Sequence, residues 1–166
     1  MVNGQRISEQ TEKRLYAGIG EMHVAHNPHQ LIIMGLGSCI GLSLYDRTAK
    51  VGGVAHIMLP DGNNGDQERS CKFANHAVPA LLKEMIRNKA KKEQIVAKIA
   101  GGASMFTAID TLKIGERNTV VVKEELKKAG IRLIAEDTGK TCARTVTLDT
   151  RTGKFSVKTK EGVKTM

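Results

Sequence analysis

The sequence predicts a layered α+β domain built on a mixed or antiparallel β-sheet. Short apolar or alternating segments bounded by turn residues recur along most of the chain, which is typical of strands. In only two segments do apolar residues recur at the three- and four-residue spacing of a helix. Because strands outnumber helices and do not alternate with them regularly, the pattern argues against a doubly wound parallel sheet. The 166 residues suffice for one domain with a substantial core.

Four strands are expected in the first half of the chain. They are Gly18–Ala25, Leu31–Met34, Ile40–Asp46 and Val51–Met58. The sequence HNPH at 26–29 separates the first two as a turn, because Asn-Pro disfavours continuation of regular structure. Pro60 ends the fourth strand, and a polar, glycine-bearing loop follows over 61–70.

Two helices and four further strands are expected in the second half. They are the helices Phe73–Ile86 and Asn118–Ala129 and the strands Ile95–Ala100, Ile131–Ala135, Thr145–Leu148 and Phe155–Val157. Gly130 follows the second helix at the position where the left-handed conformation commonly ends a helix. The last two strands are expected to form a hairpin around residues 151–153.

The expected organisation is a single domain over residues 17–160, with a flexible leader at 1–16 and a tail at 161–166. No apolar stretch approaches the length of a membrane span, and the polar N-terminus lacks the apolar centre of a secretory signal. We therefore expect a cytoplasmic protein without direct membrane insertion. The three cysteines are far apart and lack metal-site spacing, so we expect free thiols and no metal.

The formal net charge of +9 is compatible with a nucleic-acid partner or an acidic protein partner. The basic residues are dispersed, aromatic residues make up only 3% of the chain, and no nucleic-acid-binding motif is present. A nucleic-acid binder would show steeply salt-dependent retention on DNA or RNA, and we do not expect that behaviour here. An acidic protein partner remains open.

Cys39 and His56 lie on two expected neighbouring strands whose register brings them together. A four-residue loop at 47–50 joins the strands and places Gly41 opposite His56 and Met58 opposite Cys39. Cys39 and His56 are then diagonal neighbours on one face, with Cβ atoms roughly 7–8 Å apart or less. The opposite face carries an apolar set: Ile40, Leu42, Leu44, Ala55 and Ile57. A one-residue slip would spoil that set, so the apolar pattern supports the register.

A thiol beside an imidazole predicts nucleophilic chemistry. The imidazole activates the thiol, protonates a departing amine and then activates water. Gly37 and Ser38 precede the cysteine, so the backbone there has room for a substrate and offers N–H groups to an oxyanion. The alternative is that both side chains are core residues, since lone cysteines are usually buried. Cys71 and Cys142 lack a suitably spaced base and are weaker candidates.

Five separate blocks of the sequence resemble the CheD family of bacterial chemotaxis deamidases. They are GLGSC at 35–39, VGGVAHIMLPD at 51–61, AKIAGGASMF at 97–106, IGERN at 114–118 and GIRLIAEDTG at 130–139. The resemblance covers about residues 18–157. It implies a β-sandwich flanked by helices, similar to the catalytic domains of deamidating toxins. It also implies that Cys39 is the nucleophile and His56 the base.

The resemblance further implies an activity and partners. The family hydrolyses glutamine side chains of chemoreceptors to glutamate and ammonia. For this chain we expect the thiol mechanism to pass through a thioester and to need no cofactor. Some members also bind a CheC-type phosphatase. The chain departs from the family pattern at Ile33, where a threonine that orients the histidine is expected, so the third member of a triad is unknown. A backbone carbonyl, a water or a distant hydroxyl are the replacements to consider.

Two alternatives to receptor deamidation are compatible with the sequence. A catalytically weak adaptor would keep the fold and bind chemoreceptors or a CheC-type phosphatase. A cysteine protease or an amidase acting on small molecules would share the same thiol chemistry. The chain also differs from the family pattern in KFANHA at 72–77 and in EDTGKT at 136–141. These differences leave the Cys39 and His56 pair intact.

Overall fold

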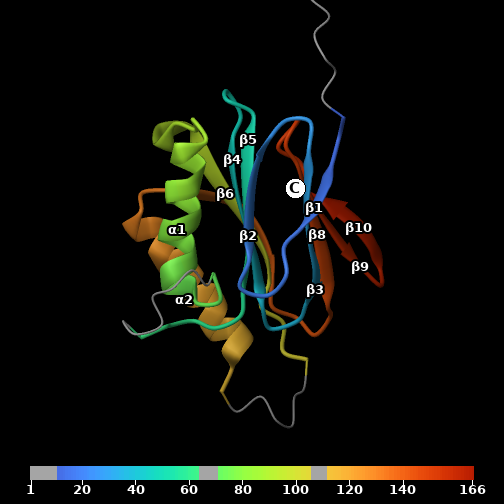
Figure 1. The fold of residues 1–166 in the computed structure, drawn as a ribbon. Helices are drawn as coiled ribbons and strands as arrows, with labels where there is room; N and C mark the ends of the chain where they lie inside the picture. The colour runs from blue at the N-terminus through green and yellow to red at the C-terminus, as the bar shows by residue number, and fades with distance from the viewer. Residues whose placement is uncertain (1–10, 64–70, 106–111) are drawn as a thin grey trace, which may run out of the picture.

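The computed structural model describes residues 11–63, 71–105 and 112–166, and this part of the chain forms three layers. Two five-stranded sheets stack face to face, and two α-helices cover the outer face of one of them (Figure 1). Each sheet contains one parallel pair of strands among antiparallel pairs. The predicted α+β class with mixed sheets is therefore confirmed.

The sheet beneath the helices has the strand order β2-β5-β4-β6-β7. Its strands are β2 (Met22–His26), β4 (Ile40–Asp46), β5 (Val51–Ile57), β6 (Ile95–Gly101) and β7 (Arg132–Thr138). Every residue of β4 and β5 is buried, because helices cover one face of these strands and the second sheet covers the other. Two-sided burial explains why glycines and apolar residues dominate both strands.

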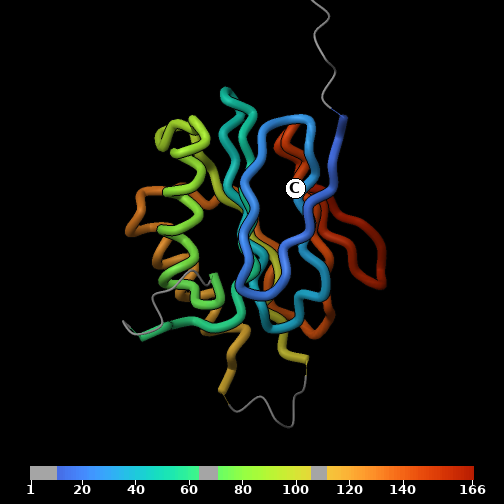
Figure 2. The backbone as a smooth tube through the Cα atoms, in the orientation of Figure 1, coloured from blue at the N-terminus to red at the C-terminus, as the bar shows by residue number. Residues whose placement is uncertain are grey.

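The second sheet has the order β1-β3-β8-β9-β10. Its strands are β1 (Arg14–Tyr16), β3 (Gln30–Leu36), β8 (Arg144–Asp149), β9 (Phe155–Thr159) and β10 (Gly162–Thr165). The edge strands β1 and β10 fall in the segments expected to be a leader and a tail, so these residues form strands instead. Each is short and depends on pairing with its neighbour, which local periodicity does not reveal. Figure 2 shows both terminal segments on this sheet.

The helices are α1 (Ala74–Arg87) and α2 (Ile114–Lys128), and a short 3-10 helix, η2 (Lys92–Gln94), precedes β6. The predicted bounds of α1 are close to those observed, because its apolar residues follow the helical period. Helix α2 begins four residues before the predicted start at Asn118. Asparagine commonly caps a helix, but here it is buried within the first turns. The loop predicted over 61–70 lies mostly outside the described residues.

The apolar residues form two cores, one on each side of the β4–β5 sheet. One core lies between this sheet and the helices, and the other lies between the two sheets. Close contact of the sheets requires a glycine at position 41, since a Cβ there would lie 2.8 Å from Leu36 Cδ1 and 3.2 Å from Val146 Cγ2. The inter-sheet core is the layer in which the candidate site lies.

Candidate active site

Strands β4 and β5 pair in the predicted register. Gly41 is opposite His56, and Asp46 is opposite Val51. Cys39 immediately precedes β4, at the end of a bend over 37–39 that follows β3. The apolar set predicted for the opposite face belongs to the core beneath the helices, as the alternation of the strands requires.

Cys39 and His56 belong to the inter-sheet layer. Cys39 is half-buried and packs against the inter-sheet core. His56 is 4% exposed, and its neighbour Val54 on the same face of β5 is part of the inter-sheet core. The structure thus places the two side chains in one layer, next to the end of the sheet.

The imidazole of His56 is held by the turn that precedes β2. Its Nδ1 lies 3.3 Å from the carbonyl oxygen of Ala17, and its backbone N–H donates to the carbonyl of Glu21 at 3.0 Å. Because a carbonyl oxygen only accepts, this contact assigns the proton to Nδ1 and leaves Nε2 with the lone pair. Nε2 is buried and has no hydrogen-bond partner among the described residues, the sulfur of Cys39 included. It is therefore an unoccupied acceptor within the site.

Ile33 does not orient the imidazole. Its side chain is fully buried in the inter-sheet core, 3.5 Å from where a Cβ on Gly41 would lie, and it carries no polar atom. Of the replacements considered from the sequence, the structure contains a backbone carbonyl, that of Ala17. The sequence offered no signal for Ala17, because any residue presents a carbonyl.

The bend that carries Cys39 is fixed through its three carbonyl groups. The Gly37 carbonyl accepts from Ala103 N–H at 2.8 Å, and the Cys39 carbonyl accepts from Gly102 N–H at 2.9 Å. The Ser38 carbonyl accepts from the Asn118 side chain at 2.9 Å. Among the described residues, the N–H groups of Ser38 and Cys39 donate to no other group. Donors left free on a rigid bend suit an oxyanion.

Burial opposes charge on both members of the pair. It raises the pKa of the Cys39 thiol, although the backbone N–H of Cys39 itself lowers it in part. It lowers the pKa of His56, against the opposing effects of the Ala17 carbonyl and the Glu21 carboxylate. Burial therefore favours a thiol and a neutral imidazole at neutral pH.

These pKa shifts predict how the cysteines react with iodoacetamide. Only the thiolate reacts, so alkylation of Cys39 should keep rising with pH beyond the ordinary thiol pKa of 9.0. Cys71 is 2% exposed and burial raises its pKa to about 11, so it should remain unmodified in the folded protein. Peptide mapping by mass spectrometry across a pH series checks both results. A plateau for Cys39 near neutral pH would contradict them.

Gly101 is expected to be irreplaceable. Its φ is +111°, and a Cβ there would overlap the carbonyl oxygen of Cys39, which is backbone and cannot swing aside. Gly101→Ala should displace the Cys39 bend, cost about 1–3 kcal/mol of stability and lower activity. Gly139→Ala is the matched control, because it also has a positive φ but no atom within 4 Å of the added Cβ. Denaturant unfolding of both variants gives the measurement, and equal losses would refute the steric argument.

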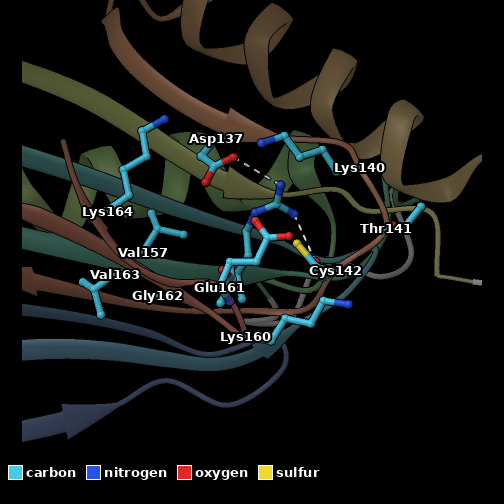
Figure 3. Close-up of a pocket in the computed structure, with 12 residues that line it drawn as sticks. Asp137, Lys140, Thr141, Cys142, Val157, Lys160, Glu161, Gly162, Val163 and Lys164 are labelled. Atoms are coloured by element: carbon cyan, nitrogen blue, oxygen red, sulfur yellow. Dashed lines mark hydrogen bonds and ion pairs between the residues drawn. The ribbon is translucent and has the colours of Figure 1, made fainter.

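A pocket of about 340 Å³ lies at the start of β8 (Figure 3). Arg144 pairs with Leu36 across the sheet, and its buried guanidinium bonds Asp137 at 3.2 Å and the Cys142 carbonyl at 3.3 Å. Cys142 lines this pocket, which contains no histidine. The pocket therefore offers Cys142 no imidazole partner, although the carboxylates of Asp137 and Glu161 line it.

Two absences hold for the described residues. No group of three or more His, Cys, Asp or Glu side chains there is placed to bind a metal ion. No helix among them is long and apolar enough to span a membrane.

Comparison with known proteins identifies the family. The sequence model described as "CheD chemotactic sensory transduction" matches residues 58–159. A Clostridium botulinum strain Hall protein named probable chemoreceptor glutamine deamidase CheD is 45% identical over 151 residues, covering 89% of this chain and 93% of its own. The chain belongs to the CheD family. A Clostridium kluyveri protein of the same name is 42% identical over the same coverage.

Solved structures offer a more distant likeness to this CheD-family chain. The Bacillus licheniformis hypothetical protein YfiH has 15% sequence identity and a TM-score of 0.48, covering 73% of this chain and 51% of its own. The family-model match begins at residue 58, two residues after His56. The likeness around Cys39 and His56 therefore rests on the relatives that align over 151 residues.

Proposed function

We propose that this protein hydrolyses the side-chain amides of specific glutamines in chemoreceptors, with Cys39 as nucleophile and His56 as general acid and base. The observation that carries the proposal is the β4–β5 register, which puts both side chains in the inter-sheet layer at the end of the sheet. Relatives at 42–45% identity are named for this activity, which supports the choice of substrate.

The reaction proceeds in two stages. Nε2 of His56 takes the proton from the Cys39 thiol as the sulfur attacks the amide carbon, and a C–S bond forms. The same proton then passes to the leaving nitrogen, the C–N bond breaks and ammonia departs, leaving a thioester. His56 next removes a proton from water, whose oxygen attacks the thioester carbon. The C–S bond breaks, glutamate is released and the sulfur recovers its proton.

The free N–H groups of the Cys39 bend stabilise the two tetrahedral intermediates. The backbone N–H of Cys39 lowers the pKa of its own thiol, and Gly37 and Ser38 belong to the same bend. The Ala17 carbonyl keeps the Nδ1–H tautomer of His56, so Nε2 remains the base. These chain groups suffice for the steps above, so no cofactor is required.

The substrate is an acidic receptor helix. The methylated regions of chemoreceptors are acidic, so the formal net charge of +9 favours encounter with them. Such a substrate implies a cytoplasmic protein whose single domain includes the edge strands β1 and β10, and a CheC-type phosphatase is a further proposed partner.

An adaptor is the second candidate, and one observation favours it. Nε2 of His56 makes no hydrogen bond to the Cys39 sulfur in this structure, and Ile33 cannot help to orient the ring. Catalytic hydrogen bonds often tighten only when substrate binds, so the contact is expected to form in the complex. An adaptor would bind receptors without changing them.

Mass spectrometry of receptor fragments tests the proposal. Cytoplasmic receptor fragments incubated with this protein should gain the mass difference between an amide and an acid at particular glutamines, with one ammonia released per site. Fragments incubated alone give the background. Receptor binding without any mass change would favour the adaptor and contradict the proposal.

A further inference from the structure

Asn118 joins the two segments that carry the candidate pair. Its side-chain Nδ2 donates to the Ser38 carbonyl at 2.9 Å and to the Met58 carbonyl at 2.9 Å. Ser38 directly precedes Cys39, and Met58 follows His56 by two residues. One amide group therefore spans the end of the Cys39 bend and the end of strand β5.

The amide is unusual in its surroundings. Asn118 is fully buried near the start of α2, whereas Val122 and Leu126, which follow it on the buried side of the helix, are apolar. Its Oδ1 is buried and has no hydrogen-bond partner in the part of the chain that the structure describes, which costs free energy. Asparagine is also a poor helix former away from the cap. The two hydrogen bonds that Nδ2 donates therefore explain the asparagine at position 118, since helix stability does not.

Only a primary amide of this length meets the geometry. Nδ2 has two protons, one for each carbonyl, whereas a hydroxyl has one and a carboxylate has none. The Gly37 and Cys39 carbonyls are held by backbone N–H groups from residues 102–103, so Asn118 supplies the one side-chain contact to the bend's three carbonyls. It also links the bend to Met58, the residue that follows β5.

We infer that Asn118 is a positioning residue that sets the separation of the Cys39 sulfur and His56 Nε2; its catalytic effect rests on the proposed function. It acts from the helix-covered face of the sheet, whereas Cys39 and His56 belong to the inter-sheet layer, so it does not touch the substrate. Without it, both carbonyls lose their donor and the bend moves relative to β5. A small displacement of reacting groups lowers the chemical step far more than substrate binding.

Three substitutions and one control test this role. Asn118→Asp keeps the shape but removes both donors, Asn118→Leu removes all polarity, and Asn118→Gln keeps the amide on a longer arm. Val122→Ala is the control, since Val122 is fully buried one turn along α2 and belongs to the apolar core beneath the helices. Circular dichroism and denaturant unfolding establish which variants fold and how much stability each loses.

Two functional readouts separate positioning from general stability. With receptor fragments, Asn118→Asp and Asn118→Leu should lower kcat about 10- to 100-fold with KM little changed, and Asn118→Gln should recover part of the loss. Without any receptor, the midpoint of Cys39 alkylation against pH should fall, because a loosened bend admits water and weakens the burial that raises the thiol pKa. Val122→Ala should leave kcat and the alkylation midpoint unchanged.

Every outcome decides the inference. Folded Asn118 variants with wild-type kcat and alkylation would overturn it, as would an equal effect of Val122→Ala. Failure of all three variants to fold while Val122→Ala folds would show that Asn118 supports the fold as a whole, which also overturns it. If the unmodified protein deamidates nothing but the alkylation midpoint still shifts only in the Asn118 variants, the proposed function fails and the positioning role stands.

Discussion

Cys39→Ala should abolish the release of ammonia from receptor fragments, with kcat lower by at least about four orders of magnitude. The thioester route needs a sulfur at this position, and alanine has no atom that forms a bond to the amide carbon. Cys39 is half-buried at the end of the sheet, so losing its sulfur should change stability by no more than about 1 kcal/mol. A stopped assay for ammonia, with circular dichroism of the variant, gives the measurement.

Cys142→Ala is the matched control for this substitution. Cys142 is also a half-buried free thiol. It lines the pocket at the start of β8, whose lining residues include no histidine. This variant should keep wild-type activity. Equal rates of ammonia release by Cys39→Ala and the unmodified protein would show that Cys39 takes no part in the reaction. Receptor binding that survives in Cys39→Ala is expected either way, because the substitution leaves the formal net charge of +9 unchanged.

His56→Gln should lower kcat by about 10²- to 10⁴-fold, which is the usual contribution of a general acid and base. Glutamine fills much of the same space, and its amide N–H can donate to the Ala17 carbonyl in place of Nδ1. It has no lone pair of suitable pKa to take the thiol proton. Comparison of kcat and KM on receptor fragments tests the result, and an unchanged kcat would show that His56 is structural.

The same substitution has a pH signature in folding. Burial lowers the pKa of folded His56 below its ordinary value of 6.5, so the unfolded chain binds this proton at a higher pH than the folded protein does. The free energy of unfolding should therefore decrease as the pH falls from 6.5 toward the lower pKa of folded His56. This decrease should be smaller in His56→Gln. His23→Gln is the control, since the His23 ring also contacts a backbone carbonyl, that of Tyr16 at 2.8 Å. If both variants lose stability in acid as the unmodified protein does, burial of His56 is not the cause.

Much of the fold was predictable because its strands and helices have clear periods. Helix α1 and strand β4 follow their apolar patterns closely, and the β4–β5 register follows from the need to keep one apolar face together. The edge strands β1 and β10 were not predictable, because each is three or four residues long and exists through its partner. The start of α2 was misplaced because its first turns bury Gly115 and Asn118, which contribute no apolar period.

The candidate pair was predictable, whereas its environment was not. Spacing and strand alternation named Cys39 and His56 and assigned them to one face, because those properties are local. The Ala17 carbonyl that fixes the His56 tautomer and the Asn118 amide that holds the bend come from segments distant in sequence.

The sequence by itself determined which residues share a strand face and which chemistry a thiol and an imidazole there would perform. Only the tertiary structure decided that both groups rest uncharged and that a helix amide joins their supporting segments. The physical reason is that side-chain periodicity is a local property of the chain. Desolvation and long-range hydrogen bonds depend on which remote segments pack together.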